Sequence, residues 1–161
     1  MMHVRPSLSP RRLAFAVLVL ATVSGCTVGT DFWRQCSCVQ SRYAGASDLS
    51  GCWHGCWRSD NTSHNGKLRA VITPCGNGRY HLRFHGTFFK LLSFEYEIDM
   101  TAQATDTGYY VSGQKDLGQL VGGVFYYSGQ VTGDDFVVNY RSCKDHGVFI
   151  LRRQRCGNCC Q

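Results

Sequence analysis

The sequence has few charged residues and no cluster of them suited to nucleic acid. Charged side chains make up 17% of the 161 residues, and three of the 17 Lys and Arg residues (Arg5, Arg11 and Arg12) lie in the first twelve positions. Without these three, the chain has 14 basic residues against 11 acidic ones, and no basic run is interleaved with aromatic residues. This balance does not favour a nucleic-acid partner.

Signatures of catalysis are also missing. The sequence contains no Gly-x-Ser-x-Gly, no His-Glu-x-x-His and no glycine loop that would cradle a phosphate. Glu95, Glu97 and Asp99 lie close together, but they alternate with apolar residues in a way that indicates a solvated row of ion pairs along a strand. The sequence therefore predicts neither an enzyme nor a bound cofactor.

No apolar run reaches the roughly 20 residues that a membrane-spanning helix requires. The longest, Leu13–Val23, follows a polar and basic segment and is itself followed by small residues. This order is typical of a secretory signal peptide. We therefore expect residues 1–25 to direct export and to be removed.

The residues around the expected cleavage point, Val23-Ser24-Gly25-Cys26, resemble the lipobox of bacterial lipoproteins. The resemblance implies cleavage before Cys26, a diacylglycerol on its sulfur and further acylation, for instance by palmitate, so that a membrane is the expected partner. Thr27 stands where an aspartate would imply retention in the inner membrane. The resemblance thus implies a lipid anchor in the bacterial cell envelope, at the outer membrane.

The rest of the chain divides into three parts by pattern. Residues 26–50 show no sustained period and are expected to form a lipidated tether, and residues 154–161 form a cysteine-rich tail. Residues 51–153 alternate apolar and polar positions between short turns, which predicts eight strands, the first at Gly51–Ser59 and the last at Gly147–Arg153. The expected fold is all-β, an antiparallel up-and-down meander that closes as a small barrel, with an open sheet or a two-sheet sandwich as alternatives.

Charge and packing together predict the pairing of two of these strands. If residue numbers that sum to 180 face each other, His85 lies opposite Glu95 and Arg83 opposite Glu97 on the outer face. On the inner face the same register places aromatic and aliphatic side chains together, pairing Phe84 with Tyr96, Leu82 with Ile98 and Tyr80 with Met100.

Two short motifs at the ends of the predicted barrel resemble the lipocalin or calycin pattern. Gly51-Cys52-Trp53 opens the first strand, and Arg152-Arg153 ends the last one. The resemblance implies that Trp53 closes one end of the barrel while Arg152 or Arg153 stacks on its ring. The first strand also resembles that of uncharacterised bacterial envelope lipoproteins, which implies no activity.

The interior of such a barrel holds either packed side chains or one small apolar ligand or lipid, and both remain open. Gly55 and Gly129 are expected to leave space there. The apolar connection at residues 88–92 either packs Phe88 into the core or exposes a tip at Phe89 that touches lipid or covers the barrel mouth. The residues expected to organise the barrel or line a ligand are Trp53, Trp57, Tyr80, Phe84, Tyr96, Tyr127, Tyr140, Arg152 and Arg153.

Ten cysteines in an exported chain favour disulfide bonds. Cys52 and Cys56 would lie about 13 Å apart on one strand and cannot pair. The start of the first strand and the end of the last meet at one end of the barrel, so we expect disulfides between tether and tail. Apart from Cys26, the candidates are Cys36, Cys38, Cys52, Cys56, Cys75, Cys143, Cys156, Cys159 and Cys160.

Two functions remain as hypotheses. The first is a membrane-anchored, non-catalytic lipoprotein whose barrel binds a small apolar ligand or has a structural role in the envelope. The alternative is a lipoprotein that handles thiols or metal, because Cys36-x-Cys38 and Cys156-x-x-Cys159-Cys160 have spacings that suit thiolate ligands. Protein partners cannot be predicted from the sequence.

Overall fold

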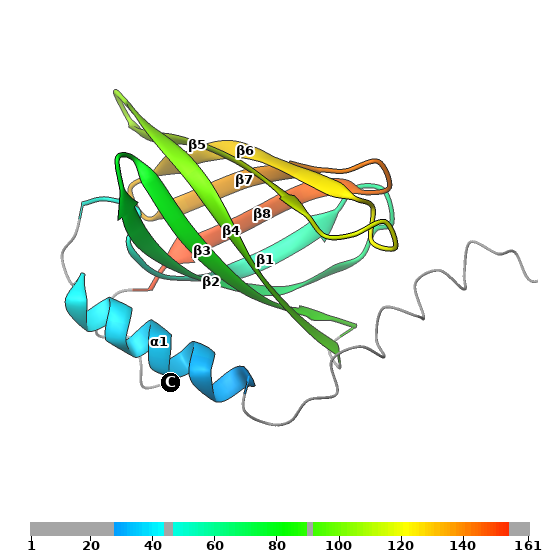
Figure 1. Cartoon of the computed structure of the whole chain (residues 1–161), viewed down its shortest axis with the longest axis horizontal. Coiled ribbons are helices and arrows are strands. Elements are labelled where there is room, and N and C mark those ends of the chain that lie inside the picture. Colours follow the sequence, from blue (N-terminus) through cyan, green and yellow to red (C-terminus); the bar gives the residue numbers. More distant parts are fainter. Residues whose placement is uncertain (1–27, 44–46, 90–91, 155–161) are drawn as a thin grey trace, which may run out of the picture.

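The computed structural model describes residues 28–43, 47–89 and 92–154 (Figure 1). The expected signal peptide, Cys26 and the tail from residue 155 onward lie outside the described residues. The described part consists of the helix α1 (Val28–Arg42) and the strands β1 (Gly51–Ser59), β2 (Asn65–Gly76), β3 (Arg79–Phe88), β4 (Leu92–Thr105), β5 (Gly108–Asp116), β6 (Val124–Thr132), β7 (Asp135–Arg141) and β8 (His146–Arg153).

The eight strands form a closed barrel. Each strand pairs antiparallel with the next along the chain, and β8 pairs with β1. The closing seam runs from Trp53 opposite Arg153 to Ser59 opposite Gly147. The predicted up-and-down meander is therefore confirmed, and the open sheet and the two-sheet sandwich are ruled out.

The two ends of the barrel contain different parts of the chain. The plug end, on the left in Figure 1, contains the first residues of β1 and the turns that follow β2, β4 and β6. The loop end, on the right, contains the turns that follow β1, β3, β5 and β7. Neighbouring strands run in opposite directions, so all even-numbered turns gather at one end and all odd-numbered turns at the other.

The predicted register between β3 and β4 is confirmed. His85 lies opposite Glu95, Arg83 opposite Glu97 and Phe84 opposite Tyr96. Gly133-Asp134 forms a two-residue connection between β6 and β7, since Thr132 pairs with Asp135. β6 starts at Val124, after a turn in which the Gly118 carbonyl accepts hydrogen bonds from the backbone N–H groups of residues 121–123.

Aromatic and aliphatic side chains from all eight strands fill the barrel. The core includes both Trp53 and Trp57 of β1, and Leu49, which precedes β1, also packs into it. The alternation of buried and exposed residues is clearest in β7, where every second side chain is buried. Such alternation is what a strand with one face in a core requires.

The chain before the barrel differs from the expected tether, because Val28–Arg42 is helical. α1 lies against the outer face of the barrel wall, where Phe32, Cys36 and Val39 are buried together with Cys52 and Val71. These three helix residues follow a spacing of four and three, so they share one face of the helix. Cys52 and Val71 face outward from the barrel and are buried only because the helix covers them.

Among the described residues, no helix is long and apolar enough to cross a membrane.

Candidate functional site

The plug end is closed by a tryptophan and an arginine. The guanidinium of Arg153 lies 4.4 Å from the centre of the Trp53 ring, a cation–π contact. It donates hydrogen bonds to the backbone carbonyls of Ser50, at 2.5 Å, and of Asp48. The indole N–H of Trp53 donates to the carbonyl of Leu49 at 3.0 Å. This one arginine therefore ties the segment before β1 to the end of β8.

The sequence left two arginines as candidates for this role, and the structure distinguishes them. The Arg153 side chain is 14% exposed and also lies 3.4 Å from an Asp134 carboxylate oxygen. The neighbouring Arg152 points outward, is 72% exposed, and pairs with the exposed Asp135 at 3.1 Å. Only Arg153 has the buried position that a plug requires.

Tyr80, on β3, is the third side chain that closes the plug end. Its hydroxyl lies 3.4 Å from a carboxylate oxygen of Asp48. Burial, and next the negative charge of Asp48, raise the pKa of Tyr80 to about 12. The tyrosine is therefore neutral at physiological pH and acts as a hydrogen-bond donor to the segment that Arg153 also holds.

The middle of the barrel is a continuous stack of aromatic rings. Phe84 lies 5.3 Å from Tyr96 and 5.4 Å from Phe149, measured between ring centres. Tyr127 lies 6.4 Å from Tyr96 and 5.9 Å from Phe149, and Tyr140 lies 5.1 Å from Phe149. Rings separated by 4.5–7 Å are in attractive contact. The predicted inward-facing aromatic residues thus pack against one another.

Two inward glycines do not leave the space that the sequence suggested. A Cβ atom added at Gly55 would clash with the carbonyl oxygen of Ile150, and one added at Gly129 would clash with that of Val137. At both positions a glycine allows the neighbouring strand to approach closely. The glycines serve the close packing of the wall, and the expectation that they widen the interior is wrong.

The tyrosines of the interior carry hydroxyl groups with different partners. The Tyr140 hydroxyl donates to Asp145 at 3.1 Å, and burial together with the Asp145 charge raises the pKa of Tyr140. Burial raises the pKa of Tyr127 to about 12, and it raises the pKa of Tyr96 well above the ordinary value for a tyrosine. The Tyr96 hydroxyl is buried and makes no hydrogen bond of good geometry to another described residue, although the Tyr127 side chain lies beside it and contributes to the raised pKa of Tyr96. A buried hydroxyl without a well-formed hydrogen bond costs free energy, so this position suits a polar ligand atom or a water molecule.

The wall near these tyrosines is incompletely paired. β4 and β5 pair only from Met100–Gly113 to Thr105–Gly108, so within the described barrel residues 92–99 have no partner strand on that side. An open depression of about 510 Å³ lies where the two strands separate, lined among others by Asp99, Gln114 and Tyr127. Most of the other lining residues, such as Arg79 and Tyr126, are exposed, so the depression lies on the outer face of the wall, and Tyr127 is the core residue beneath it.

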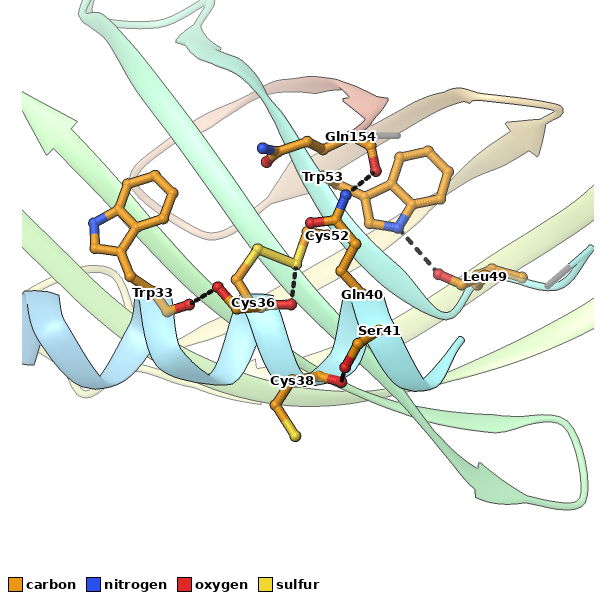
Figure 2. The surroundings of a disulfide bond; sticks show 10 residues. Trp33, Cys36, Cys38, Gln40, Ser41, Leu49, Cys52, Trp53 and Gln154 are labelled. Atoms are coloured by element: carbon orange, nitrogen blue, oxygen red, sulfur yellow. Dashed lines mark hydrogen bonds between the residues drawn. A yellow bond between two sulfur atoms is a disulfide. The ribbon is translucent and has the colours of Figure 1, made fainter. Parts of the chain in front are cut away.

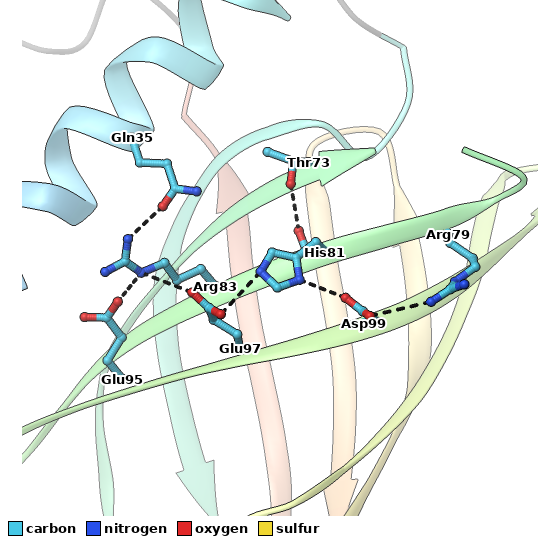
Figure 3. A network of polar contacts seen from close by, with 8 residues as sticks. All are labelled: Gln35, Thr73, Arg79, His81, Arg83, Glu95, Glu97 and Asp99. Atoms are coloured by element: carbon cyan, nitrogen blue, oxygen red, sulfur yellow. Dashed lines mark hydrogen bonds and ion pairs between the residues drawn. The ribbon is translucent and has the colours of Figure 1, made fainter. Parts of the chain in front are cut away.

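A ladder of ion pairs covers the outer face of β3 and β4 (Figure 3). His81 lies 2.8 Å from Asp99, and Arg83 pairs with Glu95 and, at 3.8 Å, with Glu97. Arg83 also donates to the Gln35 side chain of α1 at 2.9 Å. Each carboxylate faces a cation, as the predicted register requires. The ladder therefore joins the helix to the sheet.

One disulfide fastens α1 to the barrel. Cys36 is bonded to Cys52 of β1, with a Cα–Cα distance of 5.6 Å (Figure 2). Disulfides between tether and tail were expected, and that expectation is wrong for Cys36, which pairs with the first strand. Within the same cluster the Gln40 side chain donates to the carbonyl of Gln154 at 3.1 Å, which brings the helix close to the end of β8.

The other described cysteines are dispersed. Cys38 lies on the side of α1 opposite Cys36 (Figure 2), and it is exposed and free, as are Cys56, Cys75 and Cys143. As expected, Cys52 and Cys56 do not pair with each other. No group of three metal-binding side chains occurs in the described part of the chain. Cys156, Cys159 and Cys160, which the metal hypothesis requires, lie outside the described residues.

The loop end carries an aromatic cluster of its own. Trp57 donates from its indole N–H to the carbonyl of Thr87 at 2.9 Å and stacks on Phe88, with ring centres 5.9 Å apart. Phe88 packs against the core, whereas Phe89 is 61% exposed and contacts His64 at 4.9 Å. Phe88 therefore packs into the core, as one alternative expected, while Phe89 is exposed at the tip.

Sequence reasoning missed the residues of α1 that contact the barrel. Trp33 lies under the Arg69 guanidinium at 4.3 Å, and Phe32 packs against His85 with ring centres 5.5 Å apart. The signal was the spacing of Phe32, Cys36 and Val39, which is helical if the cysteine is counted as apolar. Comparison of the chain with protein-family models, with curated proteins and with solved structures gives no match.

Proposed function

We propose that the chain is a lipid-anchored, non-catalytic barrel protein of the bacterial cell envelope. The observation that carries this proposal is the position of Cys26 next to α1. The lipobox cysteine lies two residues before Val28, and α1 is joined to β1 by the Cys36–Cys52 disulfide. A lipid on Cys26 would thus be linked to the barrel through a helix that is itself fastened to the wall.

The disulfide and the chemistry of the barrel support the same proposal. Disulfides persist in oxidising compartments, which an exported chain reaches. The buried tyrosines have raised pKa values and are neutral, so they are poorly suited to donate or accept protons near neutral pH. The carboxylates of the outer ladder lie against His81 and Arg83, where they stabilise the pairing of the two strands.

The lipid anchor is tested by expressing the full chain in a Gram-negative bacterium. Wild type and the Cys38→Ser variant should fractionate with the membranes, carry acyl groups by mass spectrometry and lack residues 1–25. Cys26→Ser should accumulate unprocessed and unacylated. Cys38 is exposed and free, which makes it a matched control for the loss of a thiol. Acylation that persists in Cys26→Ser would contradict the proposal.

One observation favours a second role, the binding of a small amphipathic ligand through the depression between β4 and β5. Tyr127 is among the residues that line this depression, and its ring lies 6.4 Å from that of Tyr96, whose buried hydroxyl makes no hydrogen bond of good geometry within the described part of the chain. A ligand with one polar atom would satisfy Tyr96 while its apolar part contacts the rings.

The ligand is sought by extracting the purified protein with organic solvent, analysing the extract by mass spectrometry, and titrating fatty acids against tryptophan emission. Tyr96→Phe should weaken binding about tenfold, since it removes one hydrogen bond from a buried ligand atom. Tyr110→Phe, an exposed position at the plug end, should leave binding unchanged. A silent titration with no extracted compound would exclude this role.

A further inference from the structure

The two ends of the barrel expose different side chains. At the plug end the turns consist of small and polar residues, namely residues 76–78, 106–107 and 133–134. At the loop end Phe89, after β3, is 61% exposed and Leu120, after β5, is 74% exposed. Large apolar side chains at loop tips are costly in water and mark contact surfaces when they gather at one end.

The first turns of α1 lie toward the same end. Near its start, Phe32 and Trp33 contact His85 and Arg69, in the halves of β3 and β2 that approach the loop end. Near its C-terminal end, Gln40 contacts Gln154 at the plug end. Figure 1 shows the first turn of α1 on the side of the molecule where β3 ends and β4 begins. Trp33 is 44% exposed there.

The two ends of the barrel also differ in the charge of their exposed side chains. Lys67, Lys115 and Lys144 are exposed at the loop end. Three acidic residues lie near them: Asp60 pairs with Arg58 at 3.3 Å, Asp116 accepts a hydrogen bond from the Gly118 N–H, and Asp145 accepts one from Ser59 at 2.6 Å. The plug-end turns contain no lysine and carry Asp106 and Asp134, of which Asp134 lies 3.4 Å from Arg153. Lysines near a bilayer are attracted by anionic lipids, whereas aspartates are repelled.

We propose that the loop end of the barrel rests on the lipid surface, with Trp33, Phe89 and Leu120 at the interface. This inference builds on the proposed lipid anchor, because the length of chain between Cys26 and Val28 confines the start of α1 to the membrane surface. Exposed aromatic rings are favoured at the level of the lipid headgroups. The occupant of this surface is an anionic bilayer, and the plug end faces away from it.

The contact is measured with the full, acylated chain in vesicles of phosphatidylethanolamine and phosphatidylglycerol with brominated acyl chains. Bromine quenches only tryptophans that approach the lipid. Trp53 and Trp57 are buried, so quenching should occur in wild type and disappear in Trp33→Phe. The double variant Phe89→Ser/Leu120→Ser should lose most of the quenching. Val137→Ser, an exposed apolar residue of the barrel wall, should leave it unchanged.

Native thiols give a second measurement on the same vesicles. Cys75, near the plug end, should react with a membrane-impermeant maleimide as fast in vesicles as in detergent, whereas Cys143, in the β7–β8 turn at the loop end, should react several-fold more slowly in vesicles. Equal rates for both cysteines, or an acylated chain without quenching of Trp33, would overturn the orientation while leaving the anchor intact. Assembly into dimers through Phe89 and Leu120 would assign this surface to a second copy and also overturn it.

The two proposals fail separately. Absence of acyl mass at Cys26 refutes the anchor whatever the orientation. Quenching of Trp33 in a chain that is unacylated but binds vesicles would still support the lipid contact of the loop end.

Discussion

Replacing Arg153 with alanine should destabilise the protein far more than replacing its neighbour Arg152. Arg153 makes a cation–π contact with Trp53 and donates hydrogen bonds to the carbonyls of Ser50 and Asp48. A cation–π contact contributes about 0.5–2 kcal/mol, and a hydrogen bond from a charged donor about 1.5–3 kcal/mol. These contributions share one side chain and do not add fully, so we expect a loss of about 3–4 kcal/mol in the free energy of unfolding.

Arg152→Ala is the matched control. It removes the same side chain one position earlier, where the arginine is exposed and pairs with an exposed aspartate. Surface ion pairs contribute about 0–1 kcal/mol. Arg153→Lys should fall between the two, because lysine keeps the charge but cannot donate to two carbonyls through a planar fork.

The assay is unfolding in guanidinium chloride under oxidising conditions, followed by tryptophan emission. Trp53 and Trp57 are buried and report on the barrel. If Arg153→Ala and Arg152→Ala had the same midpoint, the plug would contribute nothing specific and the reasoning about the plug end would be refuted. If Arg153→Ala does not fold, the ranking of Arg153→Lys against Arg152→Ala still decides the question.

Three further predictions follow from other parts of the molecule. Cys36→Ser should lower the free energy of unfolding by about 3 kcal/mol, because the disulfide closes a loop with a sequence separation of 16. Cys38→Ser should lower it by less than about 0.5 kcal/mol in the same denaturation assay. Equal losses in the two variants would contradict the role of the disulfide. Gly129→Ala should lower the free energy of unfolding by about 3 kcal/mol or more, since the added Cβ would clash with the backbone of Val137. Ser128 is an exposed neighbour, and the Ser128→Ala variant should have the same melting temperature as wild type by circular dichroism. Burial raises the pKa values of Tyr80 and Tyr127 to about 12, above the value of about 10 in unfolded chains. The folded state therefore keeps these protons at a higher pH than the unfolded state does. Their contribution to the free energy of unfolding is fully present below about pH 10 and should be lost as the pH rises toward 12. Tyrosine absorbance and ellipticity recorded together should then change in the same alkaline range, and full ionisation of all tyrosines in a still-folded protein would contradict this.

The barrel could be predicted from the sequence because its strands carry two independent signals. On β3 and β4 the outward residues form charge pairs and the inward ones form apolar pairs, and one register satisfies both. A shift by one residue would place Arg83 and Glu97 in the core, so the register is strongly determined. The short polar turns then leave few ways to connect eight strands.

The helix could not be predicted with the same ease. Its buried face includes Cys36, a residue that in an exported chain is read first as a disulfide partner, and its apolar side packs on the outside of the barrel. Val71 carried the complementary signal, an apolar residue at an outward position of β2 between two inward ones. The choice between Arg152 and Arg153 likewise required the register of β8 against β1, which no charge pattern specifies.

The disulfide between α1 and β1 determines how a pulling force would act on the molecule. Tension applied at the N-terminal side of the chain passes through Cys36 to Cys52 and enters β1 near its first residue. β1 is bonded to β2 on one side and to β8 on the other. The force would therefore act along the strand, and β1 could slide only if the hydrogen bonds on both of its edges broke together. Fastening the helix to this strand makes the barrel mechanically resistant at the point where the chain is held.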